Sequence, residues 1–143
     1  MNSTMKVNGT WKSGFRVDVN SGDHSLIIDQ PESSGGKDEG PNSLEVLLFA
    51  LAGCLGTVAA IIAKQERIEL RSFELEIEGD IDKSFTMGKT DEGRAGFTEI
   101  RVKAMIDADL DDAEKLAFLE RVDSRCPTSD NLINQSNILF ELI

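Results

Sequence analysis

Metal-binding and disulfide-forming residues are scarce in this sequence, which has one histidine, two cysteines and no tyrosine. A structural zinc site takes four Cys or His ligands, and this chain has neither enough of them nor a CxxC motif, so we predict no metal and no cofactor. The first fifteen residues contain no apolar run of the kind found in secretory signals. We therefore predict a cytoplasmic protein, a compartment in which two cysteines are typical of free or redox-active thiols.

Positively charged residues are also few relative to negatively charged ones. The chain has 15 Lys and Arg against 26 Asp and Glu, for a formal net charge of -11. Nucleic acids and anionic membrane surfaces bind through Lys and Arg, so this balance argues against both as partners. A length of 143 residues with 40% apolar side chains is typical of one folded soluble domain, which we place at residues 1–143.

The longest uncharged run extends from Val46 to Ala63, with Cys54 near its middle. Its length meets the threshold for a membrane span, but it is rich in Ala and Gly and is the only such run, so we predict a buried helix over residues 44–67 and no membrane. Ser43 is the expected N-cap, with Glu45 in the first turn. This helix is on the order of 35 Å long, and covering all of its sides calls for a second subunit.

Alternation of apolar and polar residues predicts strands elsewhere in the chain. A hairpin is expected from residues 15–19 and 24–29 around an Asn-Ser-Gly-Asp turn, and two longer strands from residues 72–81 and 97–106. A second helix should begin at Asp111, and residues 138–142 alternate like a last strand. The predicted fold class is α+β, an antiparallel sheet with a long buried central helix.

The two cysteines occupy different environments. Cys126 precedes Pro127, which favours the first position of a helix, so Cys126 is expected at an N-cap, where free N–H groups lower a thiol pKa. The alternative is a small capping residue without chemistry. Cys54 taken alone suits a core position, where burial raises the pKa unless a cation or hydrogen-bond donor reaches the sulfur. Gly53 and Gly56 beside it indicate that another helix or a ligand approaches the backbone closely.

Two segments together resemble a known family. "GPNSLEVLLFALAGC", preceded by "HSLIIDQP" and "GGKDEGP", and "CPTSDNL" about seventy positions later resemble the OsmC/Ohr family of thiol peroxidases, over about residues 11–132. The resemblance implies an intertwined, swapped homodimer that defends against oxidative stress by reducing organic hydroperoxides, fatty or aryl ones rather than hydrogen peroxide. It makes Cys54 the peroxidatic nucleophile, oxidised to a sulfenic acid, and Cys126 the resolving thiol that forms a disulfide with it. A dithiol reductant, lipoylated or thioredoxin-like, would restore the pair, as in other cysteine-based peroxidases.

The same resemblance matches Glu45 to the family's glutamate at the start of the helix, which holds an arginine against the reactive thiol. Nine positions separate Glu45 from Cys54, or about 180° around a helix. Glu45 should therefore act on the partner's site, if it acts at a thiol at all; otherwise it is a carboxylate that stabilises a helix N-terminus. Arg16 is the one candidate for the activating arginine in the early strands. The spacing here departs from the organic hydroperoxide resistance branch and fits the broader OsmC-like group.

Two other functions stay open. The same fold could bind a small apolar molecule or sense oxidation with little turnover. A thiol-dependent hydrolase with Cys54 as acyl acceptor would need a nearby general base, and the one histidine, His24, lies in the predicted hairpin.

Overall fold

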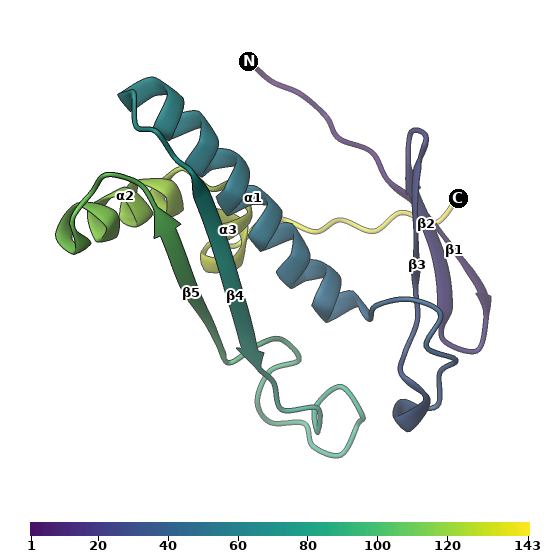
Figure 1. Ribbon diagram of the computed structural model, residues 1–143. Helices are drawn as coiled ribbons and strands as arrows, with labels where there is room; N and C mark the ends of the chain where they lie inside the picture. Colours follow the sequence, from purple (N-terminus) through teal and green to yellow (C-terminus); the bar gives the residue numbers. More distant parts are fainter. The chain divides into compact units, whose positions relative to one another are not determined.

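The computed structural model describes residues 1–143 and shows a mixed α+β chain (Figure 1). It divides into two compact units, Met1–Leu47 and Leu48–Ile143, which are described separately below.

The first unit contains a three-stranded antiparallel sheet in the order β1-β2-β3. Strands β2 (Arg16–Ser21) and β3 (His24–Ile28) form the predicted hairpin, which is confirmed, with Gly22 in the left-handed region at the turn. Strand β1 (Asn8–Ser13) was not predicted. All of its residues are exposed, so it lacks the half-buried alternation from which a strand is recognised in sequence.

The segment between β3 and the long helix is organised by one buried carboxylate. Asp29 accepts backbone N–H bonds from Gln30 at 2.8 Å, and from Lys37 and Glu39 at 3.2 Å each. The segment also passes close to β3, because a Cβ at Gly40 would lie 2.0 Å from the carbonyl oxygen of Ile27. Only glycine permits this approach. Asp29 and Gly40 thus hold an irregular, Gly-rich segment in one conformation.

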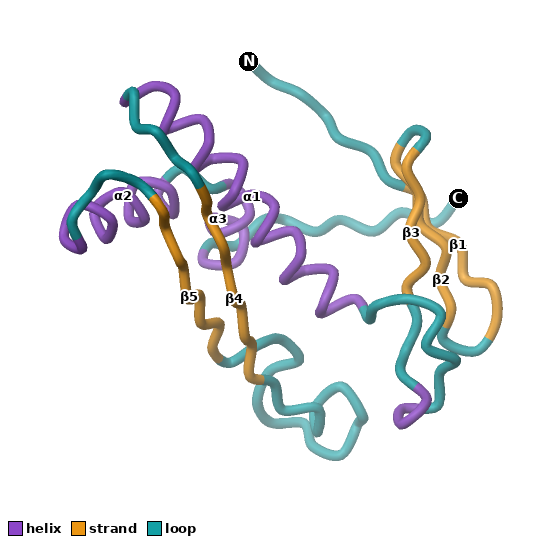
Figure 2. The backbone as a smooth tube through the Cα atoms, in the orientation of Figure 1, coloured by secondary structure: helices purple, strands orange, loops and turns teal.

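The second unit combines one long helix with a two-stranded sheet and two shorter helices (Figures 1 and 2). Helix α1 (Ser43–Glu66) begins in the first unit and is followed by the antiparallel pair β4 (Ser72–Asp80) and β5 (Glu99–Asp107). Helices α2 (Asp112–Ser124) and α3 (Pro127–Ile133) come next. The helices at 44–67 and 111 onward and both longer strands were therefore predicted to within a few residues.

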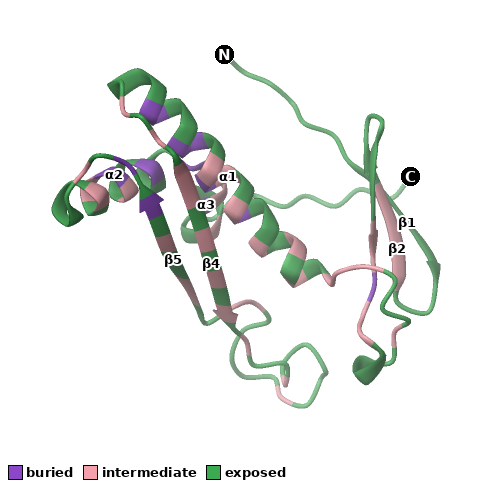
Figure 3. Cartoon of the chain, viewed as in Figure 1, coloured by how far each residue is buried: buried purple, intermediate pink, exposed green.

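The core of this unit lies where α1 meets the sheet and α2. Leu55, Ile62 and other α1 residues at helical spacing cluster with Ile106 of β5 and with Phe118 and Val122 of α2. Figure 3 shows these buried segments on α1, β5 and α2. By length and composition α1 could cross a membrane, a property shared by core helices of soluble proteins. Within the chain α1 is buried along one side only.

Two expectations need correction. The N-cap of α1 is Asn42 rather than Ser43: Asn42 Oδ1 accepts the Glu45 N–H and Glu45 Oε2 accepts the Asn42 N–H, each at 2.9 Å, which completes a capping box. Residues 138–142 form no strand, and Phe140 is 95% exposed. A strand needs a neighbour for its backbone hydrogen bonds, and no strand of the chain pairs with this segment.

We expect Asp29→Asn to lower the melting temperature by several degrees at neutral pH and to speed hydrogen exchange at Lys37 and Glu39. The N–H bond from Gln30, followed by those from Glu39 and Lys37, lowers the pKa of Asp29 against the effect of burial. A carboxyl group whose pKa is lowered in the folded state stabilises the fold at a pH above its ordinary pKa. This stabilisation is lost as the pH falls through the lowered pKa. The difference in melting temperature between the unchanged protein and Asp29→Asn should therefore vanish at low pH.

Asp38→Asn is the matched control, because it removes a charge from the same segment without removing a side-chain hydrogen bond. Equal effects of the two substitutions at neutral pH would show that charge alone, and not the Asp29 bonds, stabilises the segment.

Candidate active site

The two cysteines, far apart in sequence, meet in the second unit. Cys126 Sγ donates a hydrogen bond to Cys54 Sγ over 2.8 Å, and both thiols are free. Cys54 lies in the middle of α1 and is half-buried, whereas Cys126 is fully buried at the N-cap of α3. The predicted pairing of positions 54 and 126 in one site therefore has its geometric counterpart in the structure.

Local sequence fixes the start of α3 against α1. Pro127 occupies the first turn of α3, as predicted, and Cys126 Sγ accepts the Ser129 N–H at 3.4 Å. The buried Ser129 hydroxyl donates to Asp123 Oδ1 of α2 over 2.5 Å. These bonds tie the Cys-Pro-Thr-Ser turn to α2, which is itself packed on α1, so the position of Cys126 is set by the core.

The two thiols differ in acidity. Burial acts to raise the pKa of Cys54, but the hydrogen bond from Cys126 and those from the Thr128 N–H and hydroxyl outweigh it, so the pKa is lowered. Burial raises the pKa of Cys126, and so does its bond to Cys54, against the weaker effect of the Ser129 N–H. Cys54 is thus the more acidic thiol of the pair, and Cys126 donates the hydrogen bond between the two sulfurs.

The expectation that the N-cap position lowers the pKa of Cys126 was wrong. The N–H groups at the start of α3 do act in that direction, but a buried sulfur 2.8 Å from a second thiolate cannot easily become charged as well. For Cys54 the expected exception applies: a hydrogen-bond donor does reach its sulfur.

Cys54 opens onto a groove of about 430 Å³. The groove is lined by residues of α1 and by two residues beside Cys126: Gly53, Cys54, Thr57, Val58, Ile61, Arg125 and Pro127. No group of the chain lies within 4 Å of a Cβ built at Gly53 or Gly56. The close approach expected at these glycines is therefore not made by the chain itself, and at Gly53 the space belongs to the groove.

Glu45 and Cys54 lie on opposite sides of α1, as the spacing predicted, and Glu45 takes part in the capping box. In the first unit Arg16 pairs with Asp18 at 2.7 Å and with Glu39. These two carboxylates raise the pKa of Arg16, Asp18 more than Glu39. Arg16 and Asp18 share one face of β2, as their alternation indicated.

No group of three or more His, Cys, Asp or Glu side chains is placed to share a metal ion.

The protein-family comparison is consistent with this arrangement. The family model of the OsmC-like proteins matches residues 36–142, which include both cysteines and Glu45. The chain belongs to the OsmC-like family. No curated protein matches the sequence significantly.

Solved structures of OsmC-like proteins share the fold at low sequence identity. An OsmC-like protein from Mycoplasma pneumoniae is 20% identical, with a TM-score of 0.81 over 94% of this chain and 91% of that one. An organic hydroperoxide resistance protein OsmC from Legionella pneumophila is 19% identical, with a TM-score of 0.70 over 91% and 89%. One from Elizabethkingia anophelis is 16% identical, with a TM-score of 0.68 over 94% and 91%. At these identities the likeness concerns the fold.

Sequence reasoning missed two residues of this OsmC-like site, Thr128 and Arg125. A signal existed for Thr128, because any residue at the second position of a helix has a free N–H. Arg125 precedes Cys126 in the sequence, but its place in the groove depends on how α3 packs against α1.

We expect Thr128→Val to raise the pKa of Cys54, because the substitution removes the hydroxyl bond and keeps the backbone N–H bond. Alkylation by iodoacetamide as a function of pH, read by mass spectrometry of Cys54, measures the change. Thr57→Val is the matched control: its hydroxyl donates to the Gly53 carbonyl at 2.8 Å in the same groove. The assignment of Thr128 is wrong if both variants titrate like the unchanged protein.

Proposed function

We propose that the chain is a thiol-dependent peroxidase that reduces organic hydroperoxides through Cys54 and Cys126. The observation that carries the proposal is the 2.8 Å hydrogen bond from the Cys126 thiol to the Cys54 sulfur at the mouth of an apolar groove. A peroxidase of this kind needs a thiolate, a second thiol within reach, and a substrate site. Membership in the OsmC-like family and the names of the relatives from Legionella and Elizabethkingia support the same reading.

The first step uses the charge on Cys54. Its thiolate attacks the outer oxygen of the hydroperoxide, the O–O bond breaks, and the alkoxide leaves and takes a proton to become an alcohol. Cys54 then carries a sulfenic acid, and the electron pair lost by sulfur has reduced the peroxide. The hydrogen bonds from Cys126 and Thr128 favour this step because they stabilise the thiolate in a half-buried site.

The second step follows from the first. The negative charge of Cys54 is one reason why the pKa of Cys126 is raised, and that charge is consumed when the sulfenic acid forms. Cys126 can then lose its proton and attack the Cys54 sulfur, which releases water and leaves a disulfide. A dithiol, lipoylated or thioredoxin-like, then reduces this disulfide by thiol–disulfide exchange and returns both cysteines to thiols. We place this cycle in the reducing cytoplasm, where such dithiols are maintained.

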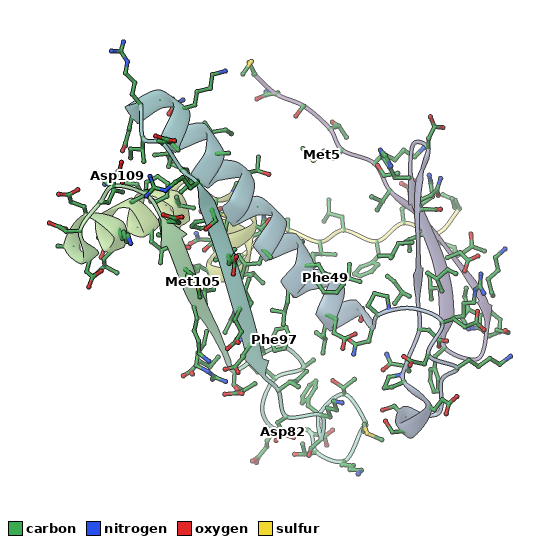
Figure 4. The ribbon with its side chains drawn as sticks, in the orientation of Figure 1. Met5, Phe49, Asp82, Phe97, Met105 and Asp109 are labelled. Atoms are coloured by element: carbon green, nitrogen blue, oxygen red, sulfur yellow. The ribbon has the colours of Figure 1, made fainter.

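We propose further that the working form is a homodimer. Helix α1 leaves Phe49, labelled in Figure 4, 60% exposed, and Ile61 is also exposed. The apolar residues of the 138–142 segment are exposed as well, and a second copy would supply the neighbour that their alternation lacks. Apolar faces of this kind mark interaction surfaces. Glu45, which is turned away from Cys54 of its own chain, would act on the partner subunit's Cys54 in this dimer.

Peroxidase activity is tested with the reduced protein, cumene hydroperoxide and dihydrolipoamide. We expect peroxide consumption and a Cys54–Cys126 disulfide by mass spectrometry. Cys54→Ser should abolish both, whereas Cys126→Ser should stop after one turnover with a sulfenic acid at Cys54 that dimedone traps. A protein that consumes no peroxide and forms no disulfide contradicts the proposal and leaves the small-molecule binding alternative.

The dimer is tested by sedimentation equilibrium. Phe49→Asp places a charge on the exposed face of α1 and should raise the dimer dissociation constant by roughly 100-fold. Met87→Asp is the control, since Met87 is 64% exposed in the loop between β4 and β5. A monomeric unchanged protein, or equal weakening by both substitutions, counts against this interface.

A further inference from the structure

Cys126 belongs to a closed ring of hydrogen bonds that joins the end of α2 to the start of α3. The Cys126 N–H donates to the Asp123 carbonyl at 3.1 Å, and the Ser129 N–H donates to Cys126 Sγ at 3.4 Å. The Ser129 hydroxyl closes the ring by donating to Asp123 Oδ1 over 2.5 Å. Of these three bonds only the last joins two side chains, so a substitution can remove it and leave the other two.

The carboxylate of Asp123 stands where a negative charge does little for α2 itself. Asp123 lies one residue before the C-terminal end of α2 (Asp112–Ser124), and a carboxylate at that end of a helix is disfavoured by the helix dipole. None of the ion pairs of the chain includes it. Its side chain bonds instead to Ser129, which is 8% exposed and whose hydroxyl needs a partner in a buried position.

The placement of Cys126 has a chemical consequence that the placement of an ordinary core residue lacks. Its sulfur already contacts Cys54 Sγ at 2.8 Å, so a disulfide between the two needs little rearrangement. Two thiols held this close act on each other at a high effective concentration, which favours the disulfide over the dithiol. If the turn that carries Cys126 were loose, disulfide formation would have to order it first, at a cost in conformational entropy.

We propose that Ser129 and Asp123 are positioning residues that hold Cys126 against Cys54 and thereby stabilise the disulfide relative to the two thiols. The hydroxyl and the carboxylate bond to each other and not to Cys54, so both act through Cys126. The inference rests on the proposed redox chemistry of the two cysteines. It does not depend on the oxidant, because the same disulfide can be formed and broken by exchange with a small dithiol.

The first experiment measures the equilibrium between disulfide and dithiol in buffers of reduced and oxidised dithiothreitol. Reduced dithiothreitol gives two electrons and two protons to the protein disulfide and becomes a cyclic disulfide itself, and mass spectrometry after alkylation reads the fraction oxidised. We expect Ser129→Ala to lower the equilibrium constant for disulfide formation roughly tenfold, the size of one hydrogen bond to a charged group. Asp123→Ala should match it, and the double variant should lose no more, because the two side chains make one contact.

Asp123→Asn separates the contact from the charge. Its amide oxygen can still accept the Ser129 hydroxyl, so this variant should keep most of the disulfide stability that Asp123→Ala loses. A role in folding alone would lower the melting temperature of the variants and leave the equilibrium constant unchanged. If Ser129→Ala does not fold, Asp123→Ala decides, because Asp123 is exposed and its truncation leaves no buried cavity.

Ser124→Ala and Asp130→Ala are the matched controls. The Ser124 hydroxyl donates to a backbone carbonyl of α2 at 2.9 Å, and the Asp130 carboxylate accepts an amide N–H from the C-cap of α3 at 2.9 Å. Both substitutions therefore remove a similar bond from the same two helices without touching the Ser129–Asp123 contact. They should leave the equilibrium constant for disulfide formation unchanged.

The second experiment follows the protein after one equivalent of cumene hydroperoxide. Cys126 loses its proton and attacks the Cys54 sulfenic acid, whose hydroxide leaves and takes up a proton to form water. Ser129→Ala should lengthen the lifetime of the sulfenic acid that dimedone traps. If peroxide oxidises neither cysteine, the proposed function fails and the dithiothreitol equilibrium still tests the inference. An equilibrium constant that Ser129→Ala and Asp123→Ala leave unchanged, or an equal loss in the two controls, overturns it.

Discussion

The hydrogen bond from the Cys126 thiol to the Cys54 sulfur can form only while the start of α3 lies against the middle of α1. Every other feature of the site depends on that placement. It decides which of the two thiols is the more acidic, and it brings the Thr128 donors to Cys54. It also places Arg125 beside the groove. The placement itself is held by the core, in which Phe118 and Val122 of α2 pack against α1, and by the bond from Ser129 to Asp123.

The sequence predicted those parts of the structure that depend on near neighbours. The N-cap position of Cys126 follows from Pro127, and the opposite orientation of Glu45 and Cys54 follows from a spacing of nine on one helix. The acidity of the thiols could not be predicted in the same way. For Cys126 the local effect of the helix start has the predicted sign, but burial and the second sulfur outweigh it, and both depend on contacts across seventy-two residues.

The prediction of strands was limited in the same way, because a local pattern does not show which distant segment pairs with a strand. Strand β1 has no buried face and so left no alternation to detect, yet it pairs with β2 along most of its length. Residues 138–142 have the alternation without a partner strand in the chain. An apolar pattern reports which face of a segment can be buried, and it does not say which surface covers it. In this chain the uncovered apolar surfaces, on α1 and in the last residues, favour a second copy.

Charge distribution links the site to the acidic composition of the chain. Where carboxylates are in excess, an arginine is expected to be paired, as Arg16 is with Asp18 and Glu39 and as Arg121 is with Glu66. A paired guanidinium is neutralised locally and attracts a second anion only weakly. The donors that lower the pKa of Cys54, the Cys126 thiol and Thr128, are in contrast neutral groups fixed by the fold. They do not depend on a cation for which the surrounding carboxylates could compete.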